Sequence, residues 1–256
     1  MKLITLNTWG GRAGKEKLLN FFKKNKKIDI FCLQEIWSAP YNHLEGTNAG
    51  GSPIDNSQIM VYGMQEISKT LPGYSSIFHP HHLDNYGLQM LIKKELIIKK
   101  KGDLFVYREK GFVPTGDVGF HARNIQYVTL GTKKGDVTII NFHGLWNGKG
   151  KADSKDRINQ SKKILEFVKS LKNEFILCGD FNLLPNTKSL DILEKEGMKN
   201  LIKEFNISST RTLLYNKPNK HADYIFVSKG IKINEFNVLL DEVSDHSPLF
   251  LDFRIF

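Results

Sequence analysis

The sequence contains only two cysteines, and they lack the CxxC-type spacing of a zinc or redox site. Cys32 and Cys178 each lie inside an apolar run, so we expect both to be reduced residues of the core. Long apolar stretches are also missing, since none approaches the roughly 18 residues of a membrane-spanning helix. Met1 to Asn7 leads directly into an expected strand, without the apolar segment and cleavage site of a secretory signal. These absences predict a cytoplasmic protein with no transmembrane segment.

Acidic residues are too few to balance the basic ones. The chain has 27 Asp and Glu against 37 Lys and Arg, which gives a net charge of +10. A basic surface favours polyanionic partners such as nucleic acid or anionic headgroups. Most of the excess is lysine scattered along the whole chain, however, and solvated faces explain it about as well. Both interpretations stay open, and we expect the protein to be a monomer.

Short apolar segments alternate with amphipathic ones along the chain. We expect strands at 3–7, 28–34, 74–78, 88–92, 96–98, 124–131, 137–142, 175–178, 224–227 and 249–253. We expect helices at 15–24, 59–70, 154–171 and 188–196. The glycine-rich segment 42–56 is typical of a long loop, and His79, His81 and His82 flank a proline in what we expect to be a surface loop. No repeat or linker divides the chain, which predicts a single α/β or α+β domain over 1–256.

Several expected strands end in acidic, amide or imidazole residues. These residues, from six places along the chain, are Asn7, Glu35, His143, Asp180, Asn182, Asp223, Asp245 and His246. A strand end is a rigid place from which to project a catalytic side chain. One such residue alone is more often a turn former or a helix cap. Six places with this chemistry instead predict a common site at the strand ends.

The motifs at these places resemble the endonuclease/exonuclease/phosphatase superfamily, which includes exonuclease III, pancreatic-type deoxyribonuclease, neutral sphingomyelinase and inositol polyphosphate 5-phosphatases. They read Leu-Asn-Thr-Trp, Leu-Gln-Glu-Ile, Asn-Phe-His-Gly, Gly-Asp-Phe-Asn, Ala-Asp-Tyr-Ile-Phe-Val-Ser and Ser-Asp-His-Ser-Pro-Leu, in this order from Asn7 to Pro248. Gly-Asp-Phe-Asn and Ser-Asp-His-Ser-Pro are specific together, whereas Gln-Glu alone is weak. The resemblance implies a four-layer α/β sandwich, in which two packed mixed β-sheets are flanked by helices.

The resemblance also implies a divalent-metal site. Glu35 is then the principal ligand, with Asn7 and Asp245 near the metal. Hard oxygen ligands of this kind suit Mg²⁺ or Mn²⁺.

The remaining strand-end residues have catalytic roles in this resemblance. Asp180 would orient and deprotonate the attacking water, and Asn182 would donate its amide to the phosphoryl oxygens. His246, polarised by Asp223, can hold a proton, and we expect the adjacent carboxylate to raise its pKa. His143 matches the second histidine of the deoxyribonuclease and sphingomyelinase branches, where it helps to stabilise the phosphate or the leaving oxygen.

Residues outside the motifs bear on the substrate. Trp146 and Lys149, shortly after His143, could stack a base and meet phosphates, although Trp146 could equally be a packing anchor. Arg123 could reach a substrate phosphate or form a surface ion pair. The segment 183–186 beside Asn182 is uncharged, which favours a diester over a monoester dianion. Tyr86 does not fall in the register of the tyrosine of the abasic-site nuclease branch, which disfavours DNA repair.

The sequence therefore predicts a Mg²⁺-dependent phosphoesterase that hydrolyses phosphodiester bonds by in-line attack of water, as a nuclease or nucleotide phosphodiesterase. One alternative is a phosphomonoesterase similar to the inositol phosphatases, and another is a sphingomyelinase-like lipid phosphodiesterase. A third is a catalytically silent binding module, against which the intact set of site residues argues. Because substrate choice in this fold depends on loops around a shared centre, the sequence does not name the substrate.

Overall fold

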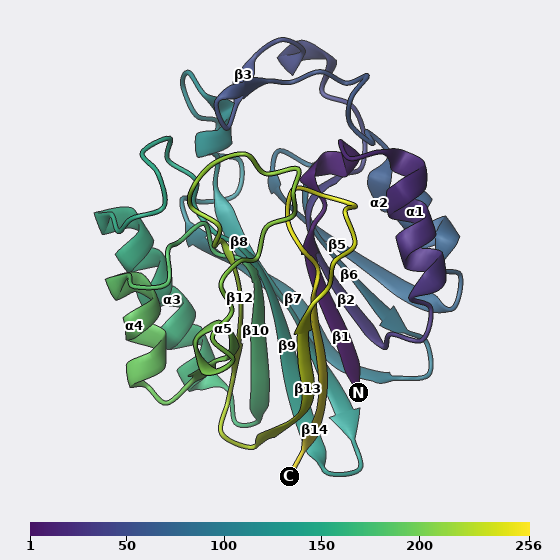
Figure 1. Cartoon of the computed structure of the whole chain (residues 1–256), viewed down its shortest axis with the longest axis vertical. Helices are drawn as coiled ribbons and strands as arrows, with labels where there is room; N and C mark the ends of the chain where they lie inside the picture. Colours follow the sequence, from purple (N-terminus) through teal and green to yellow (C-terminus); the bar gives the residue numbers. More distant parts are fainter.

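The computed structural model describes all 256 residues and contains two large mixed sheets that pack face to face (Figure 1). The strands of the first sheet are β1 (Lys2–Asn7), β2 (Ile30–Trp37), β5 (Tyr74–His82), β6 (Tyr86–Lys93), β13 (Ile231–Val238) and β14 (Leu249–Ile255). Those of the second are β7 (Ile97–Tyr107), β8 (Arg123–Thr132), β9 (Gly135–His143), β10 (Glu174–Asp180), β11 (Lys199–Asn200) and β12 (Asp223–Val227).

Each sheet has one parallel pair of strands near its middle. The first sheet has the order β13-β14-β1-β2-β6-β5, and only β1 and β2 are parallel. The second has the order β11-β12-β10-β9-β8-β7, and only β9 and β10 are parallel. Parallel neighbours end at the same edge of a sheet. The carboxyl ends of these four strands are therefore the natural place for side chains from distant parts of the chain to meet.

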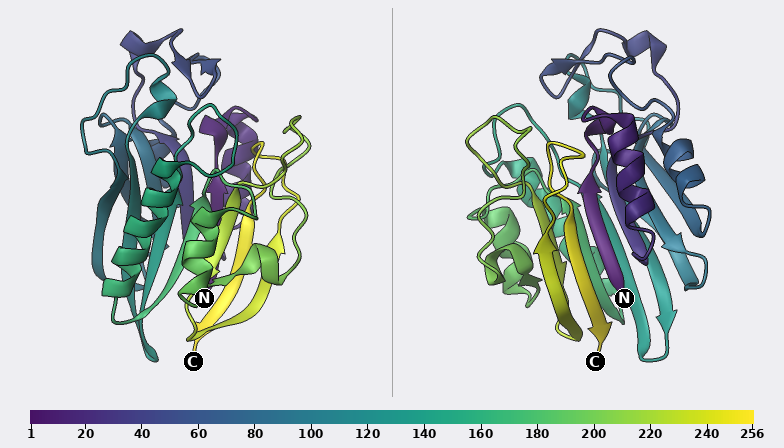
Figure 2. Two further views of the ribbon diagram at one scale, coloured as in Figure 1. Left: turned by 90° about the vertical axis from the view of Figure 1, so that its left-hand side faces the viewer. Right: turned by 45° about the vertical axis from the view of Figure 1, so that its right-hand side comes forward.

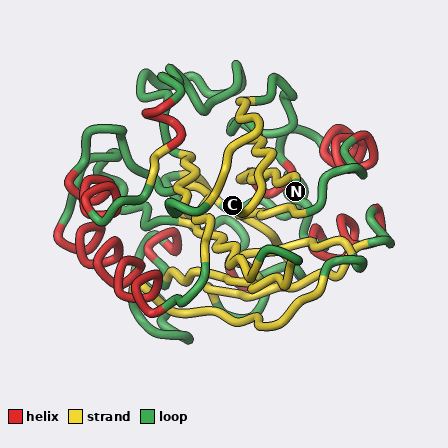
Figure 3. Tube along the Cα trace, turned by 90° about the horizontal axis from the view of Figure 1, so that it is seen from below, coloured by secondary structure: helices red, strands yellow, loops and turns green.

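Helices cover the outer face of each sheet (Figures 1 and 2). The helices α1 (Lys15–Lys24) and α2 (Gly63–Thr70) lie on the first sheet, and α3 (Lys155–Ser170), α4 (Lys188–Lys195) and α5 (Leu201–Glu204) lie on the second. Three short 3-10 helices, η1 (Trp9–Gly11), η2 (Asn42–Leu44) and η3 (Val118–Phe120), lie in connecting segments. Figure 3 shows the strands in the middle of the molecule and the helices at its periphery. The predicted four-layer sandwich is confirmed. None of the helices has the length and apolar character needed to cross a membrane.

Apolar side chains form three clusters. The largest, of 35 buried residues, fills the space between the sheets and beneath α3 and α4, and includes both cysteines, which are free and buried as predicted. A second cluster of 16 residues packs α1 and α2 against the first sheet. A third of five residues lies near the strand ends: Trp37, Tyr41, Ile54, Ile59 and Val118.

Several predictions about elements were wrong, most of them at the sheet edges. The strand β7 runs to Tyr107 instead of ending at 98, and β13 was not predicted. Both are edge strands with exposed polar residues, so they lack the apolar pattern of a central strand. The expected loop 42–56 contains a small hairpin of β3 (Asn48–Ala49) and β4 (Ser52–Pro53). The helix expected at 59–70 begins only at Gly63.

The histidines around Pro80 also differ from the prediction. They belong to β5 and not to a surface loop, and His81 and His82 are buried. The polar pattern of this segment suggested solvent, but β5 turns these rings toward residues at the end of the second sheet.

A buried amide network joins the two sheets just below the strand ends. Gln34 of β2 donates to Asn141 of β9 at 2.6 Å, and Asn141 donates to Gln126 of β8 at 3.2 Å. All three side chains are fully buried. Buried networks of this kind fix relative positions, because a shift would leave further polar atoms without partners in addition to Oε1 of Gln34, which has none. The network therefore holds the ends of β2 and β9 in register.

Candidate active site

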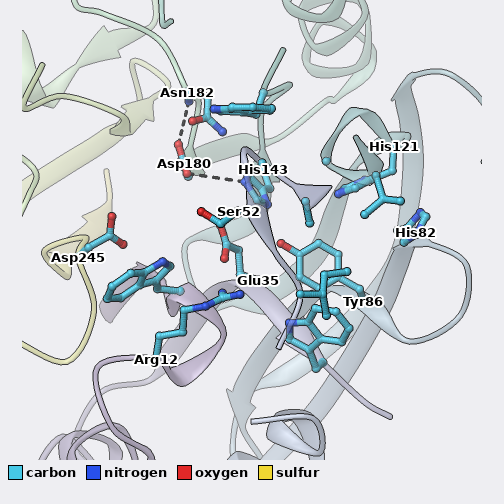
Figure 4. Close-up of a pocket in the computed structure, with 18 of the residues that line it drawn as sticks. Arg12, Glu35, Ser52, His82, Tyr86, His121, His143, Asp180, Asn182 and Asp245 are labelled. Atoms are coloured by element: carbon cyan, nitrogen blue, oxygen red, sulfur yellow. Dashed lines mark hydrogen bonds and ion pairs between the residues drawn. The ribbon is translucent and has the colours of Figure 1, made fainter. Parts of the chain in front are cut away.

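The two parallel strand pairs bring four of the predicted residues together. Asn7 and Glu35 lie at the carboxyl ends of β1 and β2, while His143 and Asp180 end β9 and β10 and are directly paired in register. In Figure 4, Glu35 lies below Asp180 and His143, and Asp245 lies to one side. Residues that are 173 positions apart in the sequence thus meet here: the Asn7 amide donates a hydrogen bond to Asp180 at 2.9 Å.

Asp180 is at the centre of this arrangement and is 1% exposed. The backbone N–H of Asn182 donates to its Oδ1 at 2.8 Å, and the Asn7 amide donates to its Oδ2. Oδ2 also lies 3.7 Å from Nε2 of His143 and 3.6 Å from Nε2 of His246. These last separations are longer than hydrogen bonds, so a small group can lie among the three side chains.

Glu35 and Asp245 carry oxygens that fit a divalent cation. The Asn7 amide holds Oε1 of Glu35 at 3.0 Å, and Arg211 holds Oδ2 of Asp245 at 2.6 Å. Oδ1 of Asp245 is buried and has no hydrogen-bond partner. Burial is the largest cause that raises the pKa of Glu35, and the negative charges of Asp245 and Asp180 raise it further. The hydrogen bond from Asn7 and the positive charge of Arg12 lower it. A bound cation would relieve this repulsion and satisfy the orphaned oxygen.

A second group could also hold a metal by distance alone. Asp180, Asp223 and His246 each offer one ligand atom, and these atoms lie within 4.8 Å of one another. Both oxygens of Asp223 already face Nδ1 of His246, at 2.8 and 2.9 Å, and one also accepts from the hydroxyl of Thr210 at 3.0 Å. We therefore assign the oxygens of Glu35 and Asp245 as the better fit to a metal.

The Asp223–His246 pair is buried, and burial shifts the pKa of both groups. Burial and the nearby Arg211 lower the pKa of His246 to about 4, and burial raises the pKa of Asp223 to about 6. Desolvation disfavours the imidazolium and outweighs the nearby carboxylates Asp245 and Asp180, so the raising effect expected of Asp223 stays a prediction. His246 is therefore neutral near pH 7 until an anion approaches it.

His143 has a different partner. Its Nδ1 lies 3.3 Å from Nη1 of Arg123, whose side chain is 2% exposed, and Arg123 also donates to the Gly119 carbonyl at 3.2 Å. Arg123 is thus not in a surface ion pair. Asn182 donates its side-chain amide to the Gly144 carbonyl at 3.2 Å, which leaves its second N–H and its oxygen at the pocket wall.

Most of these residues, but not Asn7 or Asp223, line a cavity of about 470 Å³. Trp146 lies in its wall and stacks on Phe120, with ring centroids 5.6 Å apart. Lys149 is exposed and does not line the cavity, whereas Lys151 does. A cavity of this size is typical of a small-molecule site.

Sequence reasoning missed several residues of this cavity. Arg12 and Lys217, which nothing in the sequence singled out, line it together with Tyr86, Lys151 and Arg211, to which the sequence assigned no role. Tyr86 lies close enough to Glu35 for that carboxylate to help raise the tyrosine pKa, although burial is the larger cause. Tyr86 lies two residues before the strand expected at 88–92 and is the first residue of β6 in the structure. Nothing in the local sequence distinguishes Lys217 from other loop lysines.

The comparisons with known proteins agree on one fold. A model of the endonuclease/exonuclease/phosphatase family matches residues 4–246. A mannosyl-6-phosphatase of Bacteroides thetaiotaomicron has a similar structure, with a TM-score of 0.74 and 18% identity over 100% of both chains. An endonuclease/exonuclease/phosphatase family protein of the same species gives 0.74 and 18% over 99% of this chain and 97% of that one.

The catalytic domain of human Nocturnin, solved with bound sulfate, gives a TM-score of 0.66 and 18% identity over 100% of this chain and 94% of that one. No curated protein matches the chain. At these identities the structural likenesses concern the fold, and the substrate has to be argued from the site.

Proposed function

The chain belongs to the endonuclease/exonuclease/phosphatase family, whose members hydrolyse phosphate esters, and we propose that it is a phosphodiesterase that works with Mg²⁺ or Mn²⁺. Its substrate is a nucleotide-like phosphodiester, and residues 1–256 act as one domain. The observation that carries the proposal is the convergence of Asn7, His143 and His246 on one oxygen of Asp180.

Asp180 is the group that activates water. Asn182 and Asn7 fix the orientation of its carboxylate, so Oδ2 faces the gap between the two imidazoles. A water molecule in this gap gives a proton to Oδ2 while its oxygen forms a bond to phosphorus. The bond from phosphorus to the leaving oxygen breaks on the opposite side, and the electron pair stays with that oxygen. The leaving oxygen then takes a proton from solvent, because His246 carries its ring proton on Nδ1 against Asp223 and has none at Nε2.

The other side chains stabilise charge during this step. A divalent cation held by Glu35, with Asn7 and Asp245 beside it, would polarise a phosphoryl oxygen and stabilise the leaving oxygen. Asn182 donates to a phosphoryl oxygen, and Asp223 stabilises His246 whenever its Nε2 takes up a proton. Such preorganised donors act strongly where water is excluded.

A second candidate is a phosphomonoesterase. The sequence shows no cations beside Asn182, but the fold brings cations from other segments into the cavity: Arg12, Arg123, Lys151, Arg211 and Lys217. A monoester dianion requires such an excess of positive charge. This observation keeps the monoester in competition with the diester.

The test compares bis-(p-nitrophenyl) phosphate with p-nitrophenyl phosphate in Mg²⁺, Mn²⁺ and EDTA. We expect faster cleavage of the diester, no activity in EDTA, and recovery with either metal. Asp180→Asn is the variant that tests the general base, because it keeps the size of the side chain and removes the base. General bases typically contribute about 10²- to 10⁴-fold. Full activity in chelator, or a loss below about tenfold in Asp180→Asn, would contradict the mechanism.

A further inference from the structure

Arg123 is a buried cation without a carboxylate partner. No salt bridge reaches it, and its Nε is buried without an acceptor. Its two contacts are with neutral groups, the Gly119 carbonyl at 3.2 Å and Nδ1 of His143 at 3.3 Å. Buried charges are ordinarily paired, so the contact with His143 calls for an explanation in the chemistry of the site.

This contact fixes the tautomer of His143. A guanidinium has five N–H donors and no acceptor, so Nδ1 of His143 has to accept. The ring proton then lies on Nε2. A proton on Nδ1 would place two donors and two positive charges against each other in a buried position. His143 is therefore held neutral, and burial together with Arg123 lowers its pKa well below the ordinary value.

The proton on Nε2 points into the reaction space. Nε2 of His143 lies 3.7 Å from Oδ2 of Asp180, which is too long for a hydrogen bond. The donor is therefore free for a ligand oxygen in the gap. Figure 4 shows His143 between Asp180 and the imidazole of His121.

His246 has the opposite tautomer. Its Nδ1 faces both oxygens of Asp223, which accept but do not donate at neutral pH, so the ring proton lies on Nδ1. Its Nε2 then presents a lone pair to the same gap, 3.6 Å from Asp180. The two imidazoles on either side of Asp180 thus differ: one can donate and the other can take up a proton.

The remaining groups around Arg123 support a neutral wall at this end of the cavity. The rings of His81, His82 and His121 pack together, with the His81 and His121 centroids 4.9 Å apart. Burial first, and then Arg123, lowers the pKa of each of these imidazoles. No three of their ring nitrogens converge as metal ligands would. The carboxylate nearest to His143 is that of Asp180, 3.7 Å from Nε2, whereas Nδ1 faces Arg123.

We propose that Arg123 is a positioning residue that holds His143 as the neutral Nε2–H tautomer, so that His143 is a fixed hydrogen-bond donor to a phosphoryl oxygen and not a proton carrier. The acceptor rests on the proposed function, whereas the tautomer does not. Proton transfer then belongs to Asp180 and the Asp223–His246 pair. Arg123 thereby acts through His143. The sequence had suggested instead that Arg123 could reach a substrate phosphate directly.

The first test is an NMR measurement that needs neither substrate nor metal. Protein labelled with ¹⁵N-histidine gives long-range ¹H–¹⁵N correlations that identify the protonated nitrogen of each ring, and His143→Gln assigns the His143 signals by their loss. We expect the Nε2–H tautomer at His143 from about pH 5.5 to about pH 8.5, without titration near the ordinary value of about 6.5. In Arg123→Met, His143 should become a mixture of tautomers and titrate.

Conservative rescue separates positioning from simple packing. Lysine also only donates, so Arg123→Lys should keep the Nε2–H tautomer, whereas Arg123→Met loses it. With bis-(p-nitrophenyl) phosphate, Arg123→Met should lower kcat by about 10- to 100-fold, with little change in KM. This loss is similar to, or smaller than, the loss caused by removing one preorganised hydrogen-bond donor. Arg123→Lys should recover most of kcat. Arg254→Met, which removes an exposed arginine at the far end of β14, is the matched control and should leave both constants unchanged.

Each outcome decides one question. If wild-type His143 carries its proton on Nδ1, or titrates with a pKa near 6.5, the positioning proposal is wrong. The same holds if Arg123→Met folds and leaves the tautomer unchanged, or if it raises KM and leaves kcat intact. Should Arg123→Met fail to fold, the wild-type tautomer and the Arg123→Lys variant still decide. Absence of any phosphodiesterase activity would sink the proposed function and leave the tautomer result standing.

Discussion

At the scale of single residues, the site is built on strained backbone. Glu35 and Asn182 have φ angles of 58° and 54°, in the left-handed region that few non-glycine residues adopt. Glu35 lies where the pairing of β2 with β6 shifts register between Leu33 and Ile36. Bulges of this kind turn a side chain in a new direction. The strain thus aims Glu35 at Asn7 and the cavity, as is common for functional residues held by their surroundings.

We expect Lys151 to give the site a pH dependence. Burial and then Arg211 lower its pKa to about 8, against the opposing effects of Asp180, Asp223 and Asp245. Its Nζ donates to the His221 carbonyl at 2.8 Å. Lys151 carries its positive charge below this pKa and loses it above. If the charge helps to bind an anionic substrate, kcat/KM should fall as the pH rises through about 8.

The measurement is the pH profile of kcat/KM for bis-(p-nitrophenyl) phosphate. In Lys151→Met the decline near pH 8 should disappear, with KM raised below pH 8 and close to the wild-type value above it. Lys155→Met, an exposed lysine at the start of α3, should keep the wild-type profile. If the decline persists unchanged in Lys151→Met, a group other than Lys151 causes it.

The strand-end residues could be predicted because each follows an apolar run, so periodicity alone marks its position. Other cavity residues could not, since their position depends on tertiary contacts. Lys149 and Lys151 lie in the same glycine-rich segment, and only the fold turns Lys151 toward the carbonyls of 219 and 221. Thr210, which holds Asp223 in place, lies in a loop with no pattern at all.

At the scale of elements, the hairpin β3–β4 forms a wall of the cavity. Asp117, just before η3, accepts from the backbone N–H groups of Gly50 at 2.8 Å and Gly51 at 2.9 Å. The two segments approach so closely that a Cβ on Gly119 would lie 2.5 Å from the nitrogen of Gly50. Ile54 anchors the other end of the hairpin in the small apolar cluster with Trp37 and Tyr41. The wall is thus fixed from both sides, with Asp117 as its polar clamp.

Asp117→Asn should loosen this wall. An asparagine places an NH₂ group opposite one of the two glycine N–H donors and removes the negative charge. Hydrogen bonds to charged groups contribute about 1.5–3 kcal/mol, so amide exchange across residues 46–54 should speed up by at least about tenfold. KM should rise while Tm changes little, because the main clusters lie elsewhere.

Hydrogen exchange and steady-state kinetics measure these effects, with Asp84→Asn as the control. Asp84 is an exposed aspartate in another loop, paired only with Lys110 at 3.9 Å. Unchanged exchange of the hairpin in Asp117→Asn would show that Asp117 does not hold it. The sequence predicted a plain loop here, since its glycines and polar residues carry no strand signal and the clamp comes from more than sixty positions away.

The two mixed sheets followed from the sequence only through the family resemblance, and the order of their strands was not predicted. Apolar runs located β1, β2, β9 and β10 but did not show that they form two parallel pairs. Edge strands such as β13 were missed, because their alternate exposed positions are polar. Local pattern therefore predicts the buried centre of this fold well and its edges poorly.

At the scale of the whole molecule, positive charge is spread along the chain and also gathered in the cavity. The chain carries a net charge of +10, and cations from separate segments line the cavity together with the acids of the site. The lining has five cations, Arg12, Arg123, Lys151, Arg211 and Lys217, against four acids, Glu35, Asp55, Asp180 and Asp245, so the excess of positive charge in the cavity is small. The basic surface and the cavity together favour an anionic substrate that extends beyond the reacting phosphate.

Salt dependence tests whether that substrate is a polyanion. Each phosphate contacted by Lys or Arg on a single strand lowers the slope of log K against log salt by about 0.7. Between about 50 and about 200 mM KCl at fixed Mg²⁺, kcat/KM for a single-stranded oligonucleotide should fall steeply, and that for bis-(p-nitrophenyl) phosphate should change little. Lys217→Met, at the cavity wall, should reduce the slope, whereas the exposed Lys232→Met on β13 should not. An oligonucleotide that is not cleaved, together with a preference for p-nitrophenyl phosphate over the diester, would instead show that the cavity cations serve a compact phosphomonoester.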